Sequence, residues 1–253
     1  MDSILKKIKL ITLEIVKNSP IPSFYNDYID IVSKSENFFS TDPEIKMIRN
    51  EISDILCRNL GHGYGHAKKV AIDTGVLFFV ETGRAGLNLS MEYIFRLSHI
   101  AGLLHDICRK EPEHAKAGAE YAETYLKKII ADEDIISSIA YSIENHEAFT
   151  EYSHDFPGKE AGLLSACLYD SDKFRWGPDN FEFMIWAMIE DLNISAEQFI
   201  KGYKRGVGSL EKIRNTFRTC TGQQYGPEFI DIGLEIGDKL YRRIHDEFEL
   251  YCE

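Results

Sequence analysis

The sequence predicts an all-α protein, and two observations carry that prediction. Apolar residues recur at helical spacing through most of the 253-residue chain, which is typical of helices that bury one face. Strand patterns are nearly absent, because stretches of β-branched residues alternating with polar ones do not occur between turns. We therefore expect one packed helical domain with a helical extension at each end.

Prolines and polar stretches set the limits of the first helices. An amphipathic helix over residues 4–16 is expected to end before Pro20 and Pro22. A second helix over 24–32 is expected to end in the polar stretch 33–40.

The next helix has a start signal in Thr41-Asp42-Pro43-Glu44. Thr41 is the expected N-cap, with a proline in the first turn and a glutamate three residues on. The helix should end near Arg58, before the glycine-rich run 61–66. Further along, Ser195 and Gln198 form a second capping pattern. The remaining helices are expected over 66–81, 91–108, 114–130, 133–145, 159–172, 181–192, 196–218 and 227–251.

Composition limits the class of partner. The chain carries 29 lysines and arginines against 41 acidic residues, a formal charge of −12, and no segment concentrates its basic residues. An acidic surface repels polyanions, so a nucleic-acid polymer is not an expected partner. A small phosphorylated substrate remains compatible, because bound cations set the field inside a pocket.

The cysteines and the hydropathy pattern indicate a cytoplasmic protein. Five well-separated cysteines without a Cys-x-x-Cys pair predict neither a disulfide framework nor a zinc knuckle. The first 16 residues contain lysines and Glu14 and do not resemble a signal peptide. No uncharged apolar run approaches the roughly 18 residues that a membrane span requires, so no membrane partner is expected. A homodimer is an open alternative.

The dipeptide His105-Asp106 is the most informative feature for function. It follows an apolar helical segment over 93–104, and two adjacent helical residues point about 100° apart, so one turn can present both to an ion. Other candidate ligands lie near predicted helix ends, which can converge on one cleft. They are His66, His114, His146 and Asp172.

The ligand types suggest one or two transition-metal ions. Imidazoles combined with carboxylates suit manganese, iron, cobalt, nickel or zinc, with magnesium as an alternative. Any one of these residues alone is more often a surface or hydrogen-bonded side chain, but the ordered set favours a metal site. His66, His105, Asp106 and Asp172 can hold a first ion. His114 and His146 can hold a second, with Asp106 bridging the two.

These motifs resemble the HD superfamily of metal-dependent phosphohydrolases, in particular its small stand-alone hydrolases. The resemblance covers residues 43–176, from His66 in Gly-His-Ala-Lys-Lys-Val to Asp172 in Leu-Tyr-Asp-Ser-Asp-Lys-Phe. It implies an all-helical HD-domain bundle in which a histidine, the His-Asp pair and a distal aspartate bind one ion. It also implies that further histidines bind a second ion in some subgroups. The domain organisation that follows is an N-terminal helical extension (1–42), the metal-binding core (43–176) and a C-terminal helical extension packed on it (177–253).

One departure from the family pattern bears on the substrate. Several two-metal members carry His-Asp-Ile-Gly-Lys, whereas this chain has His105-Asp106-Ile107-Cys108-Arg109-Lys110. The Gly-Tyr-Pro run of cyclic dinucleotide hydrolases is missing after the pair. Cyclic dinucleotides are therefore not expected substrates.

Several charged residues beside the ligands are candidates for catalysis and substrate binding. With Asp106, the catalytic candidates are Lys110, which can neutralise phosphate, and Glu111 as a general base. The alternative for each is an ordinary solvated residue at a helix end. Asp170 is expected to be a cap or to orient a ligand histidine. The substrate-binding candidates are His62, Lys110, Lys173 and Arg175, with Arg109 a weaker one.

The function predicted from the sequence is that of a metal-dependent phosphohydrolase. A metal-activated water would attack the phosphorus of a small phosphate ester or nucleotide. One alternative is a dinuclear iron oxygenase of HD-like architecture, which the six-ligand set permits. Another is a non-catalytic metal-binding sensor module.

Overall fold

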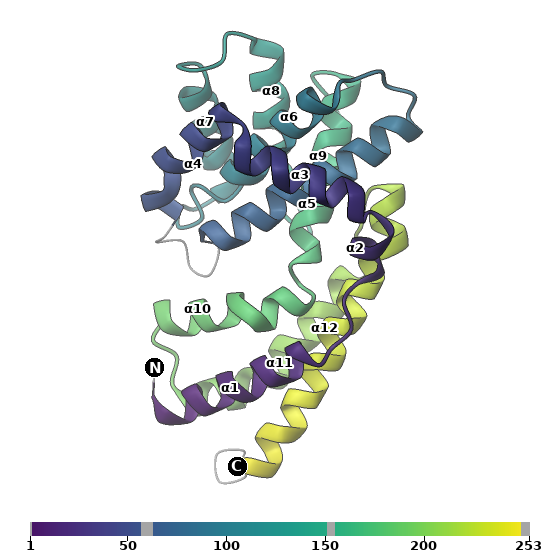
Figure 1. Ribbon diagram of the computed structural model, residues 1–253. Coiled ribbons are helices and arrows are strands. Elements are labelled where there is room, and N and C mark those ends of the chain that lie inside the picture. The colour runs from purple at the N-terminus through teal and green to yellow at the C-terminus, as the bar shows by residue number, and fades with distance from the viewer. Residues whose placement is uncertain (1, 57–62, 151–154, 249–253) are drawn as a thin grey trace.

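The computed structural model describes residues 2–56, 63–150 and 155–248, and every regular element in these ranges is a helix (Figure 1). The all-α prediction is confirmed. None of the described helices is both long and apolar enough to cross a membrane. The elements are α1 (Ser3–Lys17), α2 (Ser23–Asp27), α3 (Ile29–Thr41), α4 (Pro43–Leu56), α5 (Tyr64–Arg84), α6 (Met91–Leu104), α7 (His114–Leu126), α8 (Glu133–Glu144), α9 (Lys159–Phe174), η1 (Asn180–Met184), α10 (Ile185–Asp191), α11 (Ala196–Leu210), η2 (Glu211–Ile213) and α12 (Cys220–Glu247).

The helices form two layers joined by one long helix. Helices α3 to α9 make the larger layer, and α1, α10 and α11 lie in the second (Figure 1). The long α12 contacts α1 and α11 in the second layer and α5 and α9 in the first. The N-terminal 42 residues are divided between the layers, because α1 packs on α12 and η1 whereas α3 packs on α5 and α6.

Helix α3 corrects the predicted break at residues 33–40. This polar stretch is helical because Ser35 and Phe39, one turn apart, are both fully buried. The start of α4 also differs from the prediction. Asp42 is the cap, since its Oδ1 accepts from the backbone N–H groups of Glu44 and Ile45, each at 3.0 Å. Thr41 instead ends α3 by donating to the carbonyl of Asn37.

The C-terminal helices also differ from the expected limits. Helix α11 ends at Leu210 rather than 218, and α12 begins at Cys220 rather than 227. Thr219 caps α12 by accepting from the Gly222 N–H at 2.8 Å, which places Pro227 inside the helix. The predicted capping box at Ser195 is confirmed by reciprocal hydrogen bonds with Gln198.

The helices that carry the metal-ligand candidates cross at Gly102. A Cβ atom on Gly102 would lie 2.4 Å from the Ala71 Cα and 2.6 Å from the Ala71 backbone nitrogen. Only glycine therefore lets α6 approach α5 this closely. The crossing lies five residues after His66 on α5 and three residues before His105, so it fixes how those two side chains face each other.

Gly102→Ala is expected to destabilise the fold by about 3 kcal/mol, because the neighbour that must move is backbone. Gly83→Ala is the matched control: Gly83 also lies in α5, and nothing stands within 4 Å of its added Cβ. That control should be neutral or stabilising by about 0.5–1 kcal/mol. Urea unfolding of both variants measures the difference, and equal stabilities would contradict the close crossing.

His99 links α6 to α3 inside the core and was not singled out from the sequence. Its Nε2 lies 2.9 Å from the Ser35 Oγ, which in turn donates to the Ile72 carbonyl at 3.0 Å. The ring stacks on Phe95 and is fully buried. Burial lowers the pKa of His99 to about 3. The folded protein therefore holds this imidazole neutral at pH values where the unfolded chain protonates it.

This difference predicts a loss of stability as the pH falls from about 6.5 toward 3. Because the unfolded state binds the extra proton, the His99 contribution should cost about 1.4 kcal/mol between pH 7.5 and pH 5.5. His99→Gln removes the titration, so its free energy of unfolding should fall less than that of the wild type over this interval. Urea titrations at both pH values test this, and parallel losses in the two proteins would refute it.

Candidate metal centre

The six residues predicted as metal ligands come together where several helices end. His66 lies in the first turn of α5, and His105 with Asp106 directly follows α6. His114 begins α7, His146 lies two residues past α8, and Asp172 is in the last turn of α9. All are buried except His114, which is partly exposed. The expected convergence of helix ends is therefore present.

The first group comprises His66, His105, Asp106 and Asp172. The two Nε2 atoms of His66 and His105 are 3.1 Å apart. Asp172 Oδ1 lies 3.3 Å from His66 Nε2 and 3.7 Å from His105 Nε2. Asp106 Oδ2 lies 3.3 Å from His105 Nε2 and 3.7 Å from His66 Nε2. Donor atoms about 2.1 Å from one ion lie about 3.0–3.4 Å from each other, so this spacing suits a shared cation.

The second oxygen of Asp106 faces the other two histidines. Asp106 Oδ1 lies 3.4 Å from His114 Nε2 and 3.4 Å from His146 Nε2. The carboxylate thus stands between two pairs of imidazoles, as a bridging ligand would. Donor atoms within 4.8 Å of one another define two candidate groups, His66–His105–Asp172 and His105–Asp106–His146.

Backbone carbonyls orient two of the rings. His105 Nδ1 donates to the Gly102 carbonyl at 2.8 Å, and His146 Nδ1 donates to the Ile143 carbonyl at 2.6 Å. With the proton on Nδ1, the lone pair of Nε2 points into the cluster, as in metal-binding histidines. The donor set and its orientation therefore fit a metal ion.

The carboxylates of the cluster favour positive charge at its centre. Burial alone would lower the pKa of His105, but the Asp106 and Asp172 carboxylates outweigh it and raise that pKa to about 10. Burial would raise the pKa of Asp172, but Lys173 and the two imidazoles hold it well below its usual value. In the protein alone a proton on His105 balances the buried carboxylates. A divalent cation can take over this role.

His114 is less prepared as a ligand than the others. Burial lowers the pKa of His114 to about 4, and the charges of His146 and Arg109 add to this against the opposing effect of Asp106. Its Nε2 lies 2.7 Å from Arg109 Nη1, and its Nδ1 lies 2.8 Å from Glu147 Oε1. An ion at His114 would have to displace the Arg109 hydrogen bond.

Arg109, rather than Lys110, faces the centre. Its Nη1 is also 3.6 Å from Asp106 Oδ1. Lys110 and Glu111 are exposed and line a separate depression with Asp54 and Tyr121. The turn after α6 therefore directs Arg109 toward the cluster and Lys110 toward solvent. Sequence spacing alone does not distinguish between these two neighbours.

Lys173 and Arg175 are both buried but have different surroundings. The Lys173 ammonium donates to Asp172 Oδ2, directly beside the first group. The Arg175 guanidinium pairs with Asp73 and Asp179 and donates to the Tyr25 hydroxyl. Two carboxylates thus neutralise Arg175, so it ties α2, α5 and α9 together rather than offering a free charge.

Asp170 and His62 are the remaining candidates predicted from the sequence. Asp170 accepts from the backbone N–H groups of Arg218 and Thr219 at 2.7 and 2.8 Å, so it holds the segment that leads into α12, whose N-cap is Thr219. His62, a predicted substrate ligand, lies outside the described residues.

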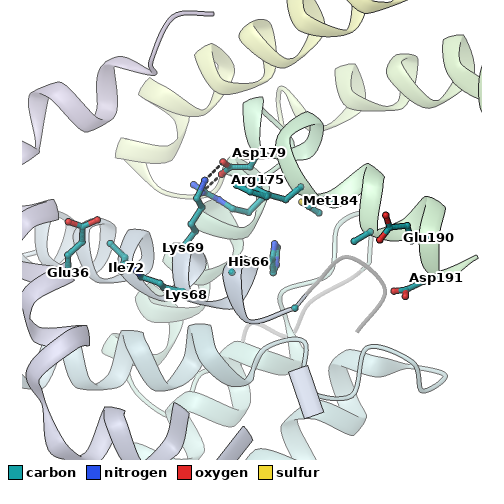
Figure 2. A pocket seen from close by; sticks show the side chains of 14 residues that line it. Glu36, His66, Lys68, Lys69, Ile72, Arg175, Asp179, Met184, Glu190 and Asp191 are labelled. Carbon is teal, nitrogen blue, oxygen red and sulfur yellow. Dashed lines mark hydrogen bonds and ion pairs between the residues drawn. The ribbon is translucent and has the colours of Figure 1, made fainter. Parts of the chain in front are cut away.

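A cleft of about 600 Å³ opens beside the cluster at His66 (Figure 2). It runs between α5 and the segment formed by η1 and α10, and its volume is in the range of small-molecule sites. Sequence reasoning missed this cleft because its two walls are more than 100 residues apart. Besides His66 and Arg175, its lining includes Glu36, Lys68, Lys69, Ile72, Asp179, Phe183, Met184, Ala187, Glu190 and Asp191.

No family model, curated protein or solved structure matches this chain. The resemblance to the HD superfamily therefore stays a prediction from motifs.

Metal removal and reloading test the centre directly. Chelator-treated wild type should bind at least one Mn²⁺ or Co²⁺ per chain and gain about 2.7 kcal/mol of stability at an ion concentration 100 times the Kd. Asp106→Ala removes the carboxylate that faces four imidazoles and should weaken ion binding by at least about 100-fold. Elemental analysis and calorimetry measure both effects.

His245→Gln is the control: it also removes a side chain that can bind a metal ion, but His245 is exposed and lies outside the cluster. It should bind ions as the wild type does. Unchanged ion content in Asp106→Ala would overturn the assignment of this centre.

Proposed function

We propose that this protein is a metal-dependent phosphohydrolase acting on a small phosphate ester or nucleotide. The observation that carries the proposal is the position of Asp106. Its buried carboxylate stands between His66–His105 and His114–His146, within a cluster that opens through His66 into a cleft. When bound, a divalent ion would lower the pKa of a coordinated water and stabilise the charge that develops on phosphoryl oxygens.

The residues of the chain have separable tasks in this proposal. His66, His105, Asp106 and Asp172 would hold a first ion, and His114 and His146 could hold a second with Asp106 between them. Lys173 keeps Asp172 ionised and oriented through its hydrogen bond to Oδ2. Arg109, which is half-exposed beside Asp106, is the cation available to donate two hydrogen bonds to a phosphoryl oxygen pair. The cleft accommodates the organic part of the ester.

The two cations distinguish this proposal from its alternatives. A dinuclear iron oxygenase needs both ion positions and has no requirement for cations beside them. A non-catalytic sensor needs no cation placed where charge develops on a phosphoryl group. Arg109 and Lys173 at the ligands, with a cleft beside His66, together favour chemistry on a phosphate group.

The experiment is a screen of phosphorylated metabolites and nucleotides against chelated protein reloaded with Mn²⁺, Co²⁺, Ni²⁺, Mg²⁺ or Fe²⁺. Phosphate release should depend on the added ion and proceed equally under anaerobic conditions. Asp106→Ala should lower kcat by at least about 1,000-fold, and Arg109→Gln by about 100-fold through loss of charge stabilisation. Arg214→Gln, which removes an exposed arginine paired with Asp231, is the control.

Oxygen consumption with no phosphate release would replace the hydrolase by the oxygenase. Ion-dependent stability without any turnover across the screen would instead support the sensor.

A further inference from the structure

The cleft beside His66 has two dissimilar walls. Helix α5 supplies His66, Lys68, Lys69 and Ile72, and η1 with α10 supplies Phe183, Met184, Ala187, Glu190 and Asp191. In Figure 2, His66 lies between the two walls, Glu36 lies at one end of the cleft, and Glu190 and Asp191 lie at the other. A ligand whose phosphate is at the metal centre would place its remaining atoms along these walls.

Part of the lining is apolar and open to solvent. The Phe183 side chain is 53% exposed although it belongs to the cleft wall, next to Met184 and Ala187. Lys69 Nζ lies 4.9 Å from the centre of the Phe183 ring. An exposed aromatic ring in a concave site is typical of a surface that contacts the hydrocarbon or aromatic part of a ligand.

The charges of the cleft favour a cation over an anion. Of its three basic residues, Arg175 and Lys69 are paired with Asp179, which leaves Lys68 without an ion-pair partner in the described structure. The carboxylates of Glu36, Glu190 and Asp191 have no ion-pair partner among the residues that the structure describes. Away from the metal centre the cleft therefore carries excess negative charge.

We propose that the cleft selects phosphate esters whose organic group is partly apolar and carries a positive charge. The apolar part would lie on Phe183 and Met184, and an ammonium or guanidinium group would face Glu190 and Asp191. A second phosphate or a carboxylate on the same group would be repelled. This inference rests on the proposed hydrolysis at the metal centre and specifies the substrate class of that site.

Three aryl phosphates that differ mainly in the charge of the para substituent test the charge preference. They are 4-(2-aminoethyl)phenyl, 4-propylphenyl and 4-(2-carboxyethyl)phenyl phosphate, whose para substituents are cationic, neutral and anionic. With the metal-loaded wild type, kcat/KM should be about 10-fold higher for the cationic ester than for the anionic one, with the neutral ester between them. The corresponding benzylphosphonates, which cannot be hydrolysed at the phosphorus–carbon bond, give the same comparison by calorimetric binding.

Variants of α10 locate the origin of the preference. Glu190→Gln/Asp191→Asn should reduce the preference to about 2-fold, and Glu190→Lys/Asp191→Lys should reverse it. Both positions are exposed, so the melting temperature should not change. Glu211→Gln/Asp246→Asn is the matched control, because it removes two exposed carboxylates that do not line the cleft.

The outcomes separate this inference from the function on which it rests. Equal kcat/KM for the three esters, or a preference that the α10 variants leave unchanged, overturns the inference while the hydrolase stands. Preferential binding of the cationic phosphonate without hydrolysis of any ester supports the charge selectivity of the cleft and overturns the hydrolase. Equal binding of the three phosphonates overturns the inference whatever the activity.

Discussion

The buried carboxylate of Asp106 is the constraint around which the rest of the site is arranged. An ionised carboxylate removed from water requires compensating positive charge or hydrogen bonds. Here the compensation comes from Arg109 and from four imidazoles, those of His66, His105, His114 and His146. Such a group is held in place only if several helix ends are fixed relative to each other. The tight crossing of α5 and α6 at Gly102 and the Nδ1 hydrogen bonds of the histidines provide that fixation.

Helix α9 connects the metal centre to the C-terminal half of the chain through two aspartates. Two residues apart on a helix, Asp170 and Asp172 point about 200° apart. Asp172 faces His66 and His105, and Asp170 binds the first residues of α12. The approach is close, because a Cβ on Gly222 would lie 2.0 Å from Asp170 Oδ2. The start of α12 is therefore hydrogen-bonded to the helix that carries the candidate ligand Asp172, and α12 is part of the scaffold of the site.

Local patterns predicted most helices and the ligand set, whereas tertiary contacts decided what they missed. The six ligand candidates share recognisable side-chain chemistry near predicted helix ends, and the structure brings them together in one cluster. Residues 33–40 are polar, so their local sequence does not predict a helix. The helix is stabilised by the burial of Ser35 and Phe39 against other helices, which local propensity does not report. The choice between Arg109 and Lys110 depends on the path of a turn, and the cleft depends on packing between distant segments. Neither is encoded in a short window of sequence.

The geometry also bears on the number of ions and hence on the reaction. The first group has its Nε2 and carboxylate oxygens at ligand spacing, and the carboxylates of Asp106 and Asp172 raise the pKa of His105 to about 10. A second ion at His114 would have to break the hydrogen bond from Arg109, and the positively charged guanidinium would remain close to the ion. Hydrolysis needs only one ion to activate water, whereas a dinuclear oxygenase needs two. In the proposed hydrolysis, Arg109 beside His114 and Asp106 is the donor that a phosphoryl group could use.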